Sequence, residues 1–375
     1  MSWSAPETLG EPDEVGFGAD RPPGRGWPRW ARWLLILAGA AVIVVAAVLT
    51  LGRPTTHSAA DQRPVTVTEA GHRLLGVRAG WDLLGYGPGR AVRIQLAQGR
   101  VTQTVVPALD SDGPVSFVAG PSQMIIRPWD FVPGYVVPDG KPARLLGGAL
   151  GHGGAAYPGP RPGEVWLQTA QPRSLSLVRM DGSEAGVSIR LPPGSWWLAS
   201  PNGRGDVLLS GVGETDDVWP GGSWQIGGML AAVGPTRWLT VNCVRPHRCA
   251  DVLINPATGT RRQLGGPPVA SVSAAAPGVI APDGASAAVF RVTASGQVTL
   301  HLLNLASGAD QPIAVPLTEG SAGPGRLAWS PDGQWLFVLT AHGRLTAVNA
   351  RTLRAEALGV RLPWLSQIAI RNASA

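Results

Sequence analysis

The feature that most constrains this chain is a unit that recurs about every 42 residues over most of its length. In each copy, a run of alternating apolar residues ends at a turn, and a second short run follows. Successive turns lie 41, 42, 40, 37, 49 and 45 residues apart, at Gly99, Gly140, Gly182, Gly222, Gly259, Gly308 and Leu353. Hairpin turns of this kind need a positive φ, which glycine adopts with little strain. The periodicity therefore predicts a repeat architecture built from hairpins.

A second turn recurs inside the units. Pro331-Asp332-Gly333 and Pro282-Asp283-Gly284 each follow a short apolar run and precede an apolar strand, and Pro201-Asn202-Gly203 is a third copy. We interpret the Asp or Asn of each turn as a turn former rather than a ligand. Four short strands per unit, each bounded by turn residues, are typical of a β-propeller blade.

The repeat predicts an all-β fold, a seven-bladed β-propeller. Its blades are expected at about 71–110, 114–149, 155–194, 195–225, 226–267, 270–317 and 324–361. The fourth is short, so six blades with an insertion is the alternative. Two further strand-like runs, at 64–70 and 363–371, lie at the ends of the repeat region. Either can complete a blade across the chain ends and so remove an exposed sheet edge.

Three segments carry a family resemblance. LAWSPDGQWLFVL, IAPDGASAAVF and LASPNGRGDVLL resemble the repeat of TolB-like and WD-repeat-like bacterial propellers, in which a WSPDG turn links the two innermost strands. The resemblance implies a propeller and a tendency to bind proteins or envelope components, and it brings no catalytic residues. The composition, with one lysine and frequent Ala, Gly, Arg and Pro, is similar to that of proteins from GC-rich actinobacteria.

An uncharged apolar stretch precedes the repeats. Trp33 to Leu51 has no charged residue, and nineteen residues suffice for a helix to cross the hydrocarbon layer of a membrane. A cleaved signal peptide is the alternative, but its apolar region is usually shorter. Four basic residues closely precede the stretch, Arg21, Arg25, Arg29 and Arg32, whereas Arg53 and Arg63 follow it. The positive-inside rule then places the N-terminus in the cytoplasm and the propeller outside.

This topology divides the chain into four predicted segments. Residues 1–32 form a disordered cytoplasmic tail, residues 33–51 a single transmembrane helix, residues 52–70 a linker, and residues 71–371 the extracytoplasmic propeller. The tail carries acidic residues among Pro and Gly without apolar periodicity, so it cannot bury enough surface to fold.

The composition excludes several other classes. With 44% hydrophobic and 15% charged residues, most of the chain should bury a core. The only lysine, Lys141, is followed by Pro142, which excludes a Walker A loop. The net charge of +6 is spread along the chain, and we expect no nucleic-acid partner outside a cell.

The only two cysteines, Cys243 and Cys249, lie in the outer region between two strand-like runs. An oxidising compartment favours a disulfide across the mouth of a hairpin. His247 lies between them, but a closed zinc site needs four ligands and this region offers three.

The densest acidic group outside the tail falls on the short fourth blade, among tryptophans. We take it as a candidate interaction loop, formed by Glu214, Asp216, Asp217, Trp219 and Trp224. Solvated loop charges and tryptophans that pack between blades are the alternative interpretation.

The sequence contains no recognisable catalytic, cofactor or metal-binding constellation. This favours a non-enzymatic, membrane-anchored platform for proteins or envelope components. One alternative is an enzyme or small-molecule binder with its site at the mouth of the propeller channel. Another is an envelope sensor that signals through the N-terminal tail.

Overall fold

The computed structural model describes residues 64–107, 109, 114–169, 173–192, 197–198, 207–210, 214–245, 248–265, 277–293, 296–317, 323 and 325–372. The chain divides into two parts, residues 1–61 and 62–375, and every described residue belongs to the second. The predicted tail and span lie outside the described residues. Within the described residues, no helix is long and apolar enough to cross a membrane.

The first sheet contains strands from both ends of the described chain. Its order is β1 (Val65–Glu69), β4 (Arg100–Val105), β3 (Arg90–Gln95), β2 (Trp81–Gly87) and β29 (Gln367–Asn372). Both runs that the sequence left over therefore join the same sheet, β1 at one edge and β29 at the other. Strand β1 also lies inside the segment predicted as a linker.

Three further sheets are four-stranded antiparallel meanders. The second meander comprises β5 (Val115–Ala119), β6 (Gln123–Pro128), β7 (Tyr135–Pro138) and β8 (Arg144–Leu145). The third comprises β9 (Ala156–Pro158), β10 (Glu164–Thr169), β11 (Ser174–Arg179) and β12 (Glu184–Arg190). The fourth comprises β13 (Trp197–Leu198), β14 (Val207–Ser210), β15 (Thr215–Trp219) and β16 (Gly222–Gln225).

The next sheet has eight strands and is made of two meanders. The fifth meander comprises β17 (Met229–Val233), β18 (Trp238–Arg245), β19 (Arg248–Ile254) and β20 (Arg261–Gln263). The sixth comprises β21 (Gly278–Ile280), β22 (Ser286–Val292), β23 (Val298–Asn304) and β24 (Asp310–Ile313). A short parallel pairing of β17 with β21 joins them.

The last meander comprises β25 (Leu327–Trp329), β26 (Trp335–Leu339), β27 (Leu345–Asn349) and β28 (Ala355–Glu356). Three 3-10 turns interrupt the described loops, η1 (Leu74–Gly76), η2 (Gly148–Gly151) and η4 (Ala341–Gly343). The fold of the described residues is therefore all-β, as predicted.

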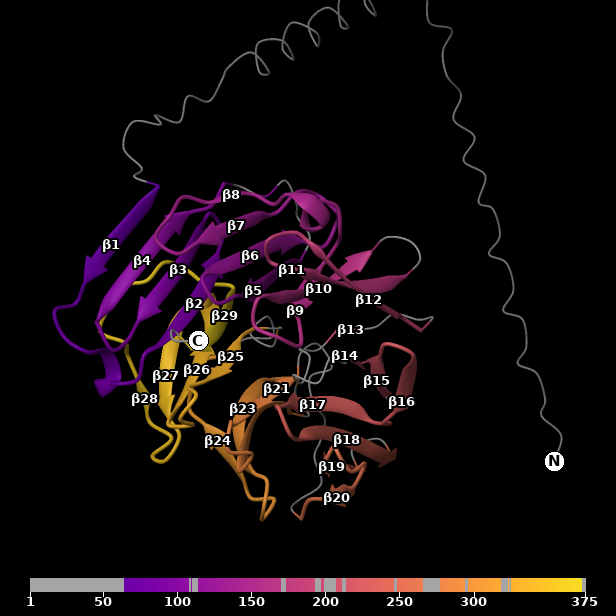
Figure 1. Ribbon diagram of the computed structural model, residues 1–375. Helices are drawn as coiled ribbons and strands as arrows, with labels where there is room; N and C mark the ends of the chain where they lie inside the picture. Colours follow the sequence, from indigo (N-terminus) through magenta and orange to yellow (C-terminus); the bar gives the residue numbers. More distant parts are fainter. Residues whose placement is uncertain are drawn as a thin grey trace, which may run out of the picture. The chain divides into compact units, whose positions relative to one another are not determined.

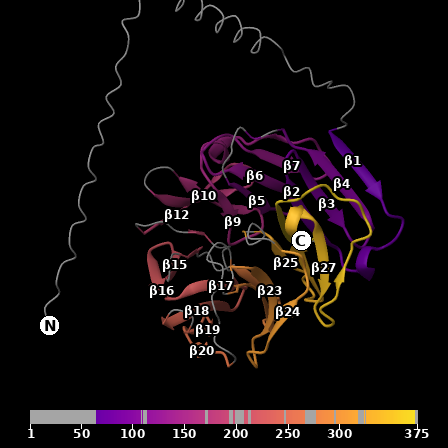
Figure 2. The same ribbon diagram turned by 180° about the vertical axis from the view of Figure 1, so that it is seen from behind.

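The meanders follow one another around a ring, in chain order (Figures 1 and 2). Their innermost strands touch in succession, from β17 through β21, β25, β29 and β5 to β9. This is the arrangement of a β-propeller, with six or seven blades according to whether the eight-stranded sheet is counted as one or two. Strand β29 closes the ring because it takes the innermost position of the first sheet, beside β2.

The core lies between neighbouring meanders. All seven residues of β2 are buried, because both faces of the strand are covered. Trp81 packs edge-on against Phe337 of the last meander, with ring centroids 5.8 Å apart. On the other face, Tyr86 stacks on Phe117 of the second meander at 6.3 Å. Alternating side chains of β2 thus pack into two different interfaces between sheets.

The turn positions behave as the periodicity predicts in all but one copy. Positive φ angles occur at Gly99, Gly140, Gly182, Gly259, Gly308 and also Leu353. In the fourth meander the positive φ falls on Gly221 instead of Gly222, because the hairpin pairs Trp219 with Gly222. The carboxylates of Asp283 and Asp332 accept backbone N–H bonds inside their turns, which confirms them as turn formers; Asn202 lies outside the described residues.

Candidate functional site

The predicted interaction loop is a hairpin of β15 and β16 on the outer side of the fourth meander. Glu214 and Trp219 are exposed, with Trp219 39% accessible, whereas Asp217 is buried. Strand alternation sends neighbouring side chains to opposite faces, so Asp216 and Asp217 do not share a face of the hairpin. The hairpin itself is present, but its acidic residues do not form one cluster.

Each face of this hairpin meets a different neighbour. Val218, on the face of Asp216, packs with Trp166 and Leu177 of the third meander. Trp224 packs against Trp238 of the fifth meander, with ring centroids 6.3 Å apart. The guanidinium of Arg261 lies 5.5 Å from the Trp224 ring centroid, a cation–π geometry. Trp224 therefore fills an interface between meanders, the alternative that the sequence left open.

The two acidic residues that do share a face repel each other. Burial and the neighbouring charge of Glu214 raise the pKa of the Asp216 carboxyl. Asp217 is directly paired with Trp224 on the opposite face. The exposed part of the predicted loop thus reduces to Glu214, Trp219 and the half-buried Asp216.

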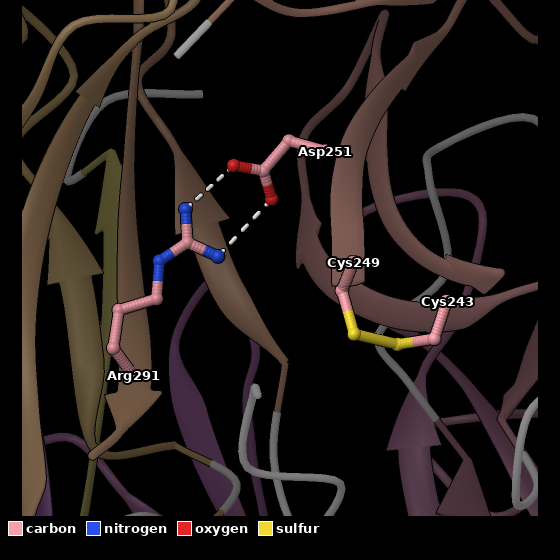
Figure 3. Close-up of a disulfide and its surroundings, with 4 residues drawn as sticks. All are labelled: Cys243, Cys249, Asp251 and Arg291. Atoms are coloured by element: carbon pink, nitrogen blue, oxygen red, sulfur yellow. Dashed lines mark hydrogen bonds and ion pairs between the residues drawn. A yellow bond between two sulfur atoms is a disulfide. The ribbon is translucent and has the colours of Figure 1, made fainter. Parts of the chain in front are cut away.

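The predicted disulfide is confirmed. Cys243 and Cys249 are directly paired across β18 and β19 and are joined by an S–S bond of 2.04 Å. The sulfur of Cys249 lies against the core shared by the fifth and sixth meanders, while Cys243 is exposed. Figure 3 shows the bond beside an ion pair between Asp251 and Arg291.

Removing this disulfide should have a modest effect. In the Cys243→Ser/Cys249→Ser variant, no disulfide restricts the unfolded chain. The two cysteines are only six residues apart, so the loss in the free energy of unfolding should be about 2 kcal/mol. Urea denaturation of the oxidised parent chain and of the double serine variant would measure the difference. A loss above about 4 kcal/mol would show that the bond does more than restrict a short loop.

Beside the disulfide lies a buried polar group that the sequence did not reveal, here named the Arg291 cluster: Asp251, Arg291, His301, Asp310 and Thr299. The Nη1 and Nη2 atoms of Arg291 donate to the two carboxylate oxygens of Asp251 at 3.0 and 2.7 Å. Asp251 is on β19 and Arg291 on β22, so this pair joins the fifth and sixth meanders. Both residues are buried, where a bidentate pair is strongest.

The cluster continues along β23 to β24. Arg291 lies 3.3 Å from the Oδ2 atom of Asp310, and Nδ1 of His301 lies 2.7 Å from its Oδ1. Nε2 of the same ring lies 3.0 Å from Oγ1 of Thr299. If Nδ1 donates to Asp310, Nε2 accepts from Thr299, so both ring nitrogens are used. These residues belong to the outer strands of their meander and not to its innermost strand β21.

Acid should weaken this cluster. Burial raises the pKa of the Asp310 carboxyl, but the hydrogen bond from His301 and the charge of Arg291 outweigh it and lower the pKa overall. A carboxyl whose pKa is lower in the folded state contributes stability above its unfolded pKa of about 3.9, and this contribution is lost as the pH falls through the folded value. The stability difference between the parent chain and Asp310→Asn should shrink as the pH falls below 4. Urea midpoints at each pH test this, and a difference that persists at pH 2.5 would contradict it.

A second buried group ties the first sheet, including β29, to the second meander. In this Arg371 cluster, Asp82 lies 2.7 Å from Nε of Arg93 and 2.9 Å from Nη2 of Arg371. Arg93 and Arg371 also contact Asp139, in the turn between β7 and β8. Because Arg371 is on β29, the strand that closes the ring is held by charge as well as by its backbone ladder.

A third arginine links the second and third meanders without a carboxylate. Arg127 on β6 is fully buried, and its guanidinium donates to the carbonyl oxygens of Gly154 and Leu150. Burial lowers the pKa of Arg127 to about 10. The backbone carbonyls supply the partial negative charge that a counter-ion would otherwise provide.

No known protein-family model matches the sequence, and no curated protein matches it. Among solved structures, the chain is similar to AztD from Citrobacter koseri, with 12% identity, coverage of 76% of this chain and 82% of that chain, and a TM-score of 0.46. It is also similar to a putative 6-phosphogluconolactonase from Bacteroides uniformis, with 12% identity, coverage of 78% and 99%, and a TM-score of 0.49.

TolB from Acinetobacter baumannii is a further neighbour, with 10% identity and a TM-score of 0.42. The match covers 77% of this chain and 66% of TolB. At 10–12% identity, these neighbours are similar to this chain in fold alone. Within the described residues, no group of three His, Cys, Asp or Glu side chains is placed to hold a metal ion.

The interface clusters were missed because their members are far apart in sequence. Asp82 and Arg371 are separated by 289 residues, and Asp251 and Arg291 by 40. One signal was present: Arg291 extends the alternation of Ala287 and Val289, which face the fifth meander. An arginine in register with buried residues on a strand indicates a buried ion pair.

Proposed function

We propose that this chain is a single-pass membrane protein that presents a seven-bladed propeller outside the cytoplasm as a non-enzymatic binding platform for proteins or cell-envelope components. The observation that carries the proposal is the Cys243–Cys249 disulfide, because such bonds persist in oxidising compartments. The uncharged stretch 33–51 and the arginines that precede it support the same orientation.

The count of seven treats the eight-stranded sheet as two blades. Its halves are each a complete antiparallel meander, and the parallel joint between β17 and β21 comprises two residue pairs, Ala232 with Gly278 and Val233 with Val279. Adjacent inner strands of a propeller approach one another closely, so a brief parallel contact fits a boundary between blades.

Lysine chemistry tests the orientation directly, because Lys141 is the only lysine and lies in an exposed turn. In intact cells, a membrane-impermeant amine reagent should label the chain at Lys141 and leave the N-terminal amine unlabelled. Lysis should add the second label. The Lys141→Arg variant is the matched control and should stay unlabelled until lysis. Labelling of Lys141 only after lysis would overturn the proposed topology.

Binding by the platform is tested through its exposed loop. A photocrosslinking residue at Trp219 in the full chain, in native membranes, should yield adducts with one protein or envelope polymer. The same residue at Leu145, which is 62% exposed on β8, is the control. Equal and unselective adducts at both positions would argue against a binding role for the loop.

A further inference from the structure

The free edge of β1 is unlike the other outer edges of the propeller. Strand β1 has the sequence VTVTE, and four of its five residues are exposed. It pairs with β4 without a register shift, and no described strand pairs with its other side. It contains no proline or glycine, and its only charged residue is Glu69 at its end, whereas proteins commonly protect an edge with charged residues or proline.

The other outermost strands in the described part of the chain are each protected. Strands β8 and β28 have two residues each. Strand β12 has a charged residue at each end and an irregular register, β20 begins with two arginines, and β24 contains a proline. Strand β16 has four residues and starts with glycine. Only β1 combines length, β-branched residues and a regular ladder among these edges.

The hydrogen bonds at the two ends of β1 show which backbone groups remain free. Pro64 accepts a bond from Val105, and Ala70 donates to Gly99, both in register with the ladder. Bonding partners alternate along an antiparallel strand, so the even-numbered residues bond β4. The N–H and C=O groups of Val65, Val67 and Glu69 therefore point to the open edge.

We propose that this edge pairs with β1 of a second copy of the chain, antiparallel and centred on Val67. The three outward-facing residues are symmetric about Val67. Val67 then faces Val67 of the second copy, and Val65 faces its Glu69, so every free N–H and C=O of both strands is bonded. On the other face, Thr66 lies opposite Thr68 of the second copy, a favourable cross-strand pair.

A five-residue edge buries less than the roughly 1,000 Å² of a stable interface, so this pairing is weak in free solution. Here the inference rests on the proposed membrane anchor. Val65 follows Leu51, the end of the predicted span, by fourteen residues, a reach of at most about 50 Å. Anchors in one membrane then raise the effective concentration of the two edges.

Crosslinking of the full chain in its native membrane tests the pairing. Because both native cysteines are paired, Val67→Cys introduces the only free thiol. Mild oxidation should yield a covalent dimer at least fivefold more than Leu145→Cys, whose site is also exposed. Equal yields, or an adduct of Val67→Cys with a different protein in place of a dimer, would overturn the proposal.

A charge variant supplies the second measurement. Val67→Lys places two ammonium groups opposite each other and should reduce energy transfer between labelled copies at least fivefold, whereas Val67→Thr should preserve it. Unchanged transfer in Val67→Lys would count against the pairing. Carbonate extraction of the same membranes separates the two ideas: an extracted chain refutes the anchor, while a retained chain that forms no dimer refutes the pairing.

Discussion

Replacing Arg291 with methionine should lower the free energy of unfolding by about 3–5 kcal/mol, one of the largest effects of any single substitution in this chain. The substitution leaves Asp251 buried between the fifth and sixth meanders without the guanidinium that now neutralises it. Asp310 loses the same partner but keeps His301. Urea denaturation of the full chain in mild detergent, followed by tryptophan fluorescence, would measure the loss.

The double variant Arg291→Met/Asp251→Leu should recover most of that loss, because well-packed apolar side chains often replace a buried ion pair at little cost. The resulting double-mutant cycle isolates the coupling of the two residues. Arg262→Met is the matched control. Arg262 bridges the same two meanders through carbonyls of Leu305 and Ala306 but is exposed, so its loss should stay below about 1 kcal/mol. Equal effects of Arg291→Met and Arg262→Met would refute the importance of the buried pair.

Arginine recurs at the boundaries between meanders. Arg127, Arg237, Arg262, Arg291 and Arg371 each bond an atom of the neighbouring meander. A planar guanidinium with five donors can bind a carboxylate bidentately or several carbonyls at once, which the point charge of lysine cannot do. The excess of arginine over lysine, which on sequence grounds indicated only base composition, thus has a structural use in this ring.

Local chemistry explains what the sequence could predict. A turn with a positive φ requires little more than a glycine at that position, so the turns at Gly99, Gly140 and Gly308 could be predicted. Cys243 and Cys249 are close in sequence and pair within one hairpin. Both features depend on a few consecutive residues.

The candidate site could be predicted less well, because it depends on which face each side chain takes. Asp216 and Asp217 are adjacent in sequence, so in a strand their side chains point to opposite faces. This separation could already have been predicted from the sequence. The sequence predicted Gly222 as the turn residue, but the positive φ is at Gly221, one position earlier. Residue type alone cannot choose between two consecutive glycines. The ion clusters need knowledge of which meanders are neighbours, and this emerges only from the closed ring.

Deleting residues 366–375 should abolish cooperative folding of the propeller. The deletion removes β29 and leaves the inner edge of β2 unpaired, although all seven residues of β2 are buried. It also removes Ile368 from the core and breaks the ion pair between Arg371 and Asp82. Together these losses should exceed about 5 kcal/mol, comparable to the whole stability of many folded domains.

Deleting residues 373–375 alone is the matched control and should leave the melting temperature within a few degrees, because β29 ends at Asn372. A synthetic peptide of residues 363–375, added during refolding of the truncated chain, should restore the melting transition, since the strand closes the ring by pairing rather than by its covalent connection. Thermal melts and protease resistance report both results. A truncated chain that melts cooperatively near the temperature of the parent would show that the ring does not depend on β29.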